Sequence, residues 1–103
     1  MGEVTVHVRI PAGLRQATAG ASTVEAPVAD GGPGRAPDVR ALLDHLAAAY
    51  PDLERRVRDE QGRLRRHVNV FVGATNIRDL DEQATALGDG DEVAILPAVS
   101  GGG

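Results

Sequence analysis

A strict alternation of apolar and polar residues near the N-terminus constrains the fold more than any other feature of this chain. Residues 4–10 place β-branched apolar side chains on one face and Thr5, His7 and Arg9 on the other. A period of two indicates a β-strand with one buried face. Such a strand is stable only in a sheet whose apolar face is covered, so the rest of the chain must supply both the sheet and the cover.

The remaining patterns predict those parts. Further strands are predicted at 22–28, 68–72 and 92–96. A short return strand is expected to open at Ile77. Apolar residues follow Asp38 at helical spacing and stop before Pro51, which predicts one amphipathic helix capped by Asp38.

The connections are expected to lie within one domain. Residues 29–37 are a loop by composition, and the charged stretch 52–66 is interpreted as a short helical turn followed by a loop, with its arginines solvated. The order of elements predicts an α+β fold, a mixed sheet over one main helix, in residues 1–97. Residues 98–103 are expected to form a flexible glycine tail.

The composition excludes several classes of function. The 103 residues include 11 basic and 15 acidic ones, a formal charge of −4, which argues against nucleic acid and membranes as partners. Every basic residue is Arg and no Cys is present, which excludes lysine and thiol chemistry. The three histidines are too scattered in the sequence to predict a metal site. The N-terminus lacks the apolar run of a signal peptide, so the cytoplasm is the expected location.

The second half of the chain carries the most specific motif. After the predicted strand 68–72 come Asn76-Ile77-Arg78, then Leu87-Gly88-Asp89-Gly90-Asp91, an apolar run and three closing glycines. This succession resembles the sulfur carriers of the ThiS/MoaD family, most nearly those of the CysO type. The likeness covers nearly the whole chain in element order and is specific from Arg66 onward. The third glycine and the long 29–37 loop depart from the family pattern.

The resemblance implies both a fold and a chemistry. The fold is the β-grasp, or ubiquitin-like, arrangement. In this family an E1-like enzyme uses ATP to adenylate the terminal glycine carboxylate, and sulfur then replaces the adenylate to give a thiocarboxylate. By position, Gly103 would carry that group and Gly102 would complete the diglycine, although a mature end trimmed to Gly102 stays open. The chain would be a co-substrate rather than an enzyme, with no permanently bound cofactor.

The tail has the physical properties that this chemistry requires. Glycine lacks a Cβ, so residues 101–103 can pass a narrow channel and adopt φ values closed to other residues. From Pro97 to Gly103 the extended chain spans roughly 23 Å, at about 3.3 Å per residue. That length suffices to reach a buried site in a partner. We expect the partner to contact Pro97, Ala98, Val99, Ser100 and Gly101.

An apolar patch beside the tail is expected to dock the same partner. If the valines of 68–72 face the core, Phe71 stands on the outer face of the sheet, and the same period puts Leu96 outward. Together they would form a modest patch of the kind that marks docking. Alternatively, the 80–87 segment covers Phe71. The acidic residues of the preceding turn would either form a charged rim or remain solvated: Asp89, Asp91 and Glu92.

Three functions remain open at this point. The first is a carrier that feeds a biosynthetic enzyme. For the CysO type, the resemblance implies a PLP-dependent cysteine synthase as sulfur acceptor and a metalloprotease that frees the new cysteine. The second is the small subunit of molybdopterin synthase, or a carrier for thiazole or another sulfur-containing product. The third is a ubiquitin-like interaction or modifier module without sulfur chemistry.

Overall fold

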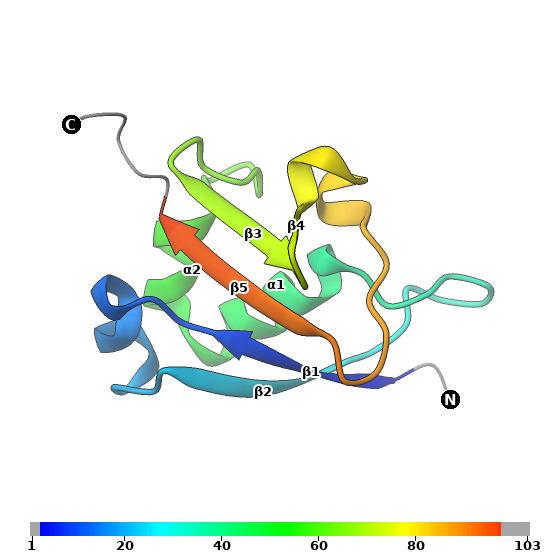
Figure 1. Cartoon of the computed structure of the whole chain (residues 1–103), viewed down its shortest axis with the longest axis horizontal. Coiled ribbons are helices and arrows are strands. Elements are labelled where there is room, and N and C mark those ends of the chain that lie inside the picture. The colour runs from blue at the N-terminus through cyan, green and yellow to red at the C-terminus, as the bar shows by residue number, and fades with distance from the viewer. Residues whose placement is uncertain (1–2, 98–103) are drawn as a thin grey trace.

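A five-stranded sheet with helices on one face forms the body of the protein (Figure 1). The computed structural model describes residues 3–97. The elements are, in chain order, β1 (Val4–Arg9), the 3₁₀ helix η1 (Ala12–Thr18), β2 (Thr23–Val28), α1 (Val39–Ala49), α2 (Pro51–Val57), β3 (Val68–Val72), β4 (Thr75–Asn76), the 3₁₀ turns η2 (Ile77–Asp79) and η3 (Glu82–Ala84), and β5 (Glu92–Pro97). The predicted mixed sheet over one main helix is confirmed.

The last strand lies at the centre of the sheet. The strand order is β2-β1-β5-β3-β4, with β1 parallel to β5 and the other neighbours antiparallel. Val8 pairs with Val93 on one side of β5, and Val72 pairs with Val93 on the other. The strand that leads into the tail is therefore held from both sides.

The alternation in β1 does what the sequence predicts. Val6 and Val8 have no exposed surface, whereas Arg9 is exposed and His7 half-buried. β2 pairs antiparallel with β1 and buries Ala26 on the same side. The apolar faces of the strands thus form a floor that the helices cover.

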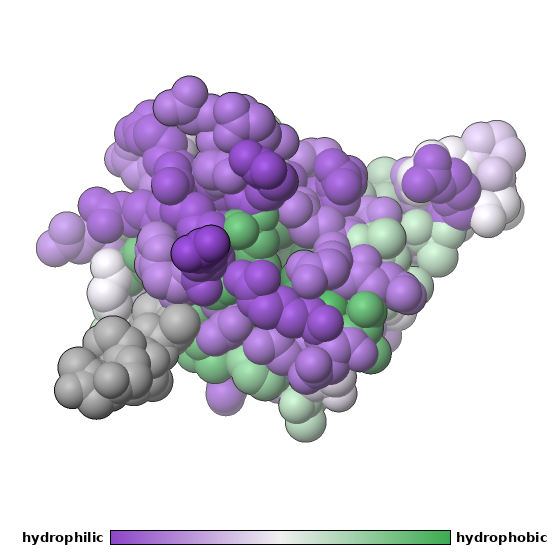
Figure 2. Space-filling view, turned by 90° about the horizontal axis from the view of Figure 1, so that it is seen from above, coloured by the Kyte–Doolittle hydropathy of each residue, from purple (hydrophilic) through white to green (hydrophobic). Residues whose placement is uncertain are grey.

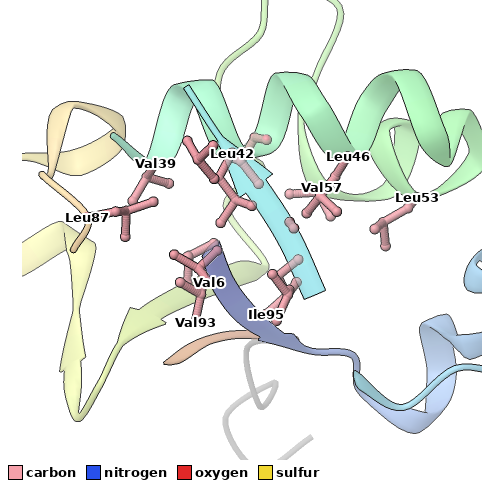
Figure 3. Packing of buried hydrophobic residues seen from close by; sticks show 14 of the residues in the cluster. Val6, Val39, Leu42, Leu46, Leu53, Val57, Leu87, Val93 and Ile95 are labelled. Carbon is pink, nitrogen blue, oxygen red and sulfur yellow. The ribbon is translucent and has the colours of Figure 1, made fainter. Parts of the chain in front are cut away.

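The main helix begins and ends where its sequence signals predict. The Asp38 carboxylate accepts a hydrogen bond from the backbone N–H of Ala41 at 2.9 Å, which satisfies one of the free donors of the first turn. Tyr50 ends α1, and Pro51 begins α2 because proline suits the first turn of a helix. Figure 3 shows side chains of both helices pointing to the core residues of β1 and β5. The buried residues of α1 are Val39, Leu42, Leu43 and Leu46.

One local prediction was wrong. The return strand is β4 at Thr75–Asn76, and Ile77 instead begins a 3₁₀ turn and is fully buried. Gly73 adopts φ +60° directly after β3, which turns the chain too early for pairing at residue 77. The connection after β1 contains η1, whose Thr18 hydroxyl donates to the backbone carbonyl of Ala21 at 3.0 Å.

Arg58 was wrongly placed among solvated arginines. Its side chain is only 5% exposed and lies between α1, α2 and η3. Its Nε donates to both carboxylate oxygens of Glu54, at 2.9 and 3.0 Å, and Nη2 donates to Asp44 at 2.8 Å. Nη1 donates to the Gln83 side chain at 3.1 Å, and Gln83 in turn donates to the Gly62 carbonyl. Burial lowers the pKa of Arg58, but the hydrogen bonds and charges of Glu54 and Asp44 outweigh burial and raise this pKa above its ordinary value.

The outside of the described chain is mainly polar. Figure 2 shows a face covered mostly by hydrophilic residues, with hydrophobic ones visible between them. Two large apolar residues among those described stand well exposed, Leu80 at 46% and Leu96 at 40%. None of the helices described is both long and apolar enough to cross a membrane.

Candidate functional site

The end of β5 is the base of the candidate site, because the glycine tail follows it. Val93 and Ile95 point into the core with no exposed surface, and Ala94 and Leu96 face outward as predicted. The backbone of Pro97 pairs with Val68 of β3. On the other side the β1 ladder ends at Ala94. The last part of β5 is thus fixed by β3 and open toward η1.

Phe71 lies on the outer face, as the period of β3 predicts. It pairs with Ala94 of β5 and with Asn76 of β4. It is half-buried and is not among the residues that pack against the core. Leu96 of β5 pairs with Asn69 of β3, so Phe71 and Leu96 are diagonal neighbours, and Asn69 and Ala94 occupy the other two positions of this part of the outer face. The apolar surface is therefore narrower and more polar than the expected patch.

A side-chain cluster that the sequence did not predict fixes the strand beside β5. The Asn76 amide donates to Asn69 at 3.2 Å, and the Asn76 side chain accepts from the Arg78 N–H at 3.0 Å. The Arg78 guanidinium donates to the carbonyls of Val68 and Arg65 at 2.9 and 3.1 Å. The sequence contains the Asn-Ile-Arg motif, but the residues that Asn76 and Arg78 hydrogen-bond lie in β3 and in the loop before it. The cluster holds the start of β3, on which Pro97 pairs.

Two cavities flank the end of β5 and share Pro11. One, of about 380 Å³, lies between η1, α2 and the start of β3. Its lining is Pro11, Gly13, Leu14, Arg55, Arg56, Arg65, His67 and Val68. The other, of about 370 Å³, opens on the outer face of the sheet. Its lining is Arg9, Ile10, Pro11, Arg15, Ser22, Thr23, Ala94 and Leu96.

The acidic turn lies at the opposite end of β5. Asp89 accepts a hydrogen bond from the Thr5 N–H at 2.8 Å, and Asp91 accepts one from the Gly88 N–H at 2.8 Å. Gly90 adopts φ +84°, a conformation that favours glycine. Two of the three acidic residues thus have a structural role in the turn, and the β5 strand separates them from the tail.

The histidines stay apart, as their spacing indicates. His7 is half-buried in β1, whereas His45 on α1 and His67 before β3 are exposed. Within residues 3–97 there is no group of three or more His, Cys, Asp or Glu placed to hold a metal ion.

The predicted tail residues fall beyond the described chain. Ala98, Val99, Ser100, Gly101, Gly102 and Gly103 lie outside it, and Pro97 is described by its backbone alone. Of the predicted contact residues, Leu96 and the backbone of Pro97 lie at the end of β5, and Phe71 lies further back, opposite Ala94.

Comparison with known proteins gives sequence matches over nearly the whole chain. The model of the ThiS family matches residues 8–102. The sulfur carrier protein CysO of Mycobacterium tuberculosis is 37% identical over 101 residues, covering 96% of this chain and 100% of that protein. The molybdopterin synthase sulfur carrier subunit of the same organism is 42% identical over 65 residues, covering 63% of this chain and 64% of that protein.

Solved structures of similar fold also cover most of this chain. A chain of the Amycolatopsis orientalis BexX/CysO complex superposes with a TM-score of 0.77 at 30% identity, covering 92% of this chain and 97% of that one. The small archaeal modifier protein 1 of Haloferax volcanii superposes with a TM-score of 0.75 at 32% identity, covering 93% and 99%. The predicted β-grasp fold is confirmed by these neighbours.

Proposed function

Because this chain belongs to the ThiS family, a family of small sulfur carriers, we propose that its C-terminal glycine is adenylated by an E1-like enzyme and converted to a thiocarboxylate that donates sulfur. In this proposal residues 1–97 form the domain, residues 98–103 form the tail, and Gly103 carries the reacting carboxylate. The carrier acts in the cytoplasm as a protein co-substrate, and ATP is bound by the activating enzyme.

The position of β5 is the observation that best supports the proposal. Paired with β3 through Pro97 and with β1 up to Ala94, β5 gives the tail a rigid base in the middle of the sheet. An extended tail of roughly 23 Å, at about 3.3 Å per residue, then carries the carboxylate away from the body. The partner can enclose the reacting group while the domain stays outside its site.

The reaction requires two substitutions. A carboxylate oxygen of Gly103 attacks the α-phosphorus of ATP and pyrophosphate leaves. Sulfide then adds to the acyl carbon, and AMP leaves with one of the original carboxylate oxygens. The product is a thiocarboxylate, in which sulfur takes the place of that oxygen. A carboxylate alone is a poor electrophile, so the adenylate is needed before sulfur can enter.

The partners follow from this chemistry. An E1-like enzyme charges the tail, and a biosynthetic enzyme accepts the sulfur. The likeness to CysO favours an acceptor of the PLP-dependent cysteine synthase type and a metalloprotease that releases the product. A CysO chain is present in the BexX/CysO complex, so a carrier of this fold can assemble with another protein. We propose that Phe71 and Leu96 contact the partner together with residues 97–101.

Two other functions have specific support. The match to a molybdopterin synthase subunit favours a small subunit held in a stable assembly. The likeness to a small archaeal modifier favours attachment of the tail to other proteins. The match covers nearly all of CysO but only about two thirds of the molybdopterin subunit. For this reason we prefer the carrier that feeds a biosynthetic enzyme to the two alternatives.

Intact-protein mass spectrometry tests the proposal. After incubation with ATP, an E1-like enzyme and sulfide, we expect a gain of about 16 Da confined to the C-terminal peptide, as oxygen is replaced by sulfur. The same enzyme must charge a second, established carrier in a parallel reaction. No mass change under those conditions would overturn sulfur transfer, and a covalent adduct with another protein would establish the modifier function.

A further inference from the structure

The charges of this acidic protein are distributed unevenly along β5. At the start of the strand lie Asp89, Asp91 and Glu92. At its end, the two cavities are lined by arginines and one histidine. We call these residues the basic collar: Arg9, Arg15, Arg55, Arg56, Arg65 and His67. The strand spans roughly 20 Å at about 3.3 Å per residue, and Arg9 lies partway along it, because it pairs with Ala94.

Most of the collar arginines are not neutralised by neighbours within the described chain. Among ion pairs between described residues, one involves the collar, Arg55 with Asp52. Arg15 and Arg65 donate to backbone carbonyls at 3.1 and 2.8 Å, which orients them without cancelling their charge. Arg9 and Arg56 are exposed. The collar therefore keeps a positive potential on a molecule whose formal charge is −4.

The collar surrounds the base of the tail. The cavity that holds Arg55, Arg56 and Arg65 includes Val68, the pairing partner of Pro97. The cavity that holds Arg9 and Arg15 includes Leu96. Any surface that receives the tail and contacts Leu96 must therefore also approach these arginines.

We propose that the collar binds a rim of aspartate and glutamate side chains around the opening through which the activating enzyme takes the tail. This inference rests on the proposed function and adds the chemistry of the partner surface. Because the acidic turn lies at the far end of β5, such a rim attracts the carrier in one orientation, with the tail leading. Opposite charges at an interface chiefly raise the association rate and select orientation.

A protein rim fits the collar better than a nucleic acid does. Asp52 interrupts the collar and lines a neighbouring groove with Arg56. A long polyanion that follows the sheet would also meet Asp89 and Asp91 at the far end of β5. A compact acidic surface avoids the repulsion at the far end of β5, and the Asp52 charge is paired with Arg55.

The kinetics of thiocarboxylate formation test the collar, with a control variant of the same net charge. We compare wild type with Arg9→Glu/Arg56→Glu, which reverses one exposed collar charge beside each cavity. The control is Arg35→Glu/Arg40→Glu, which makes the same change in net charge at exposed positions in the 29–37 loop and at the start of α1, outside both collar cavities. The readout is kcat/KM for thiocarboxylate formation by an E1-like enzyme, at low and at high salt.

We expect the collar variant to lose about tenfold or more in kcat/KM at low salt, with kcat unchanged, and the difference to shrink at high salt. The control should stay within about twofold of wild type, since neither of its residues lines the two collar cavities and exposed charges act mainly over short range in salt. If wild type and both variants charge equally at every salt concentration, the collar inference fails while the proposed function stands. If wild type itself is not charged, the proposed function fails. Urea unfolding of each variant confirms that the fold is intact.

Discussion

Arg58 donates a hydrogen bond from Nη2 to the Asp44 carboxylate at 2.8 Å, so the residue that follows α2 is tied to the middle of α1. The same guanidinium holds Glu54 and Gln83, so one side chain joins both helices to η3. Of the described buried side-chain polar atoms, none lacks a partner. Arg58 therefore has a structural role, whereas most other arginines of the described chain lie at the surface.

Replacing this arginine should destabilise the fold. Arg58→Met keeps much of the side-chain volume but leaves Glu54 and the buried Gln83 carbonyl without their donor. We expect the free energy of unfolding to fall by about 2–3 kcal/mol, as for the loss of one partner in a buried polar network. Urea unfolding measures it. Arg56→Met on the exposed side of α2 is the control and should change stability by less than about 0.5 kcal/mol. Equal stability of both variants would contradict the structural role.

Asp59 should make stability depend on pH in the acid range. Its carboxylate accepts from the N–H groups of Arg63 and Gln61, both at 2.9 Å, and the bond from Arg63 leads the causes that lower its pKa below 3.8. A depressed folded pKa means that the charged form stabilises the protein above the unfolded pKa. That stabilisation is lost as the pH falls through the folded pKa.

The test compares wild type with Asp59→Asn, which keeps an acceptor oxygen but removes the charge. The difference in unfolding free energy should be constant near neutral pH and decrease below about pH 4. A carboxyl NMR titration should place the pKa of Asp59 itself below 3.8. A titration midpoint at or above that value would show that the turn does not favour the charged form.

The two exposed leucines offer a matched pair for the docking patch. The two variants are Leu96→Asp and Leu80→Asp. Leu96 lies near the end of β5, where the tail begins, and Leu80 lies between η2 and η3. Both side chains are at least 40% exposed, so each change should cost less than about 1 kcal/mol of stability. We expect Leu96→Asp to raise the KM for charging about tenfold, since a carboxylate must lose its hydration to enter an apolar contact. Leu80→Asp should leave KM unchanged. Equal effects of the two would remove Leu96 from the docking surface.

Shortening the tail separates its chemistry from the fold. Deletion of Gly102 and Gly103 should abolish the gain of about 16 Da, while the midpoint of urea unfolding stays the same, because the deletion lies beyond β5. Deletion of Gly103 alone tests whether a chain that ends in Gly102 can also be charged. A doubly truncated protein that still accepted sulfur would disprove the need for Gly102 and Gly103.

The elements that could be predicted from the sequence are those with a strong period. β1 and α1 each bury a whole face, so Val6 and Val8, and likewise Leu42 and Leu46, recur at the spacing of their element. η1 has no such period, because its shape depends on contacts of Leu14 with the core. The alternation of β3 and β5 likewise predicted the outward positions of Phe71 and Leu96.

What escaped prediction depends on partners far apart in the chain. An arginine in a charged stretch gives no local sign of burial, and Arg58 is buried only because Asp44, Glu54 and Gln83 converge on it. The position of β4 was missed because β-branched Ile77 favours a strand, whereas Gly73 and the Asn76 cap impose an early turn. The basic collar combines residues of β1, η1, α2 and the loop before β3, which only the folded chain brings together.

The central place of β5 also has a consequence for the synthesis of the protein. β1 and β3 do not pair with each other, because β5 lies between them and pairs with both. Of the five strands described, β5 is the last to be synthesised, so the sheet cannot close on a nascent chain that still lacks it. A chain cut short before β5 has no centre and remains a substrate for proteases. Only a chain that has been translated at least to the end of β5 can therefore complete the sheet.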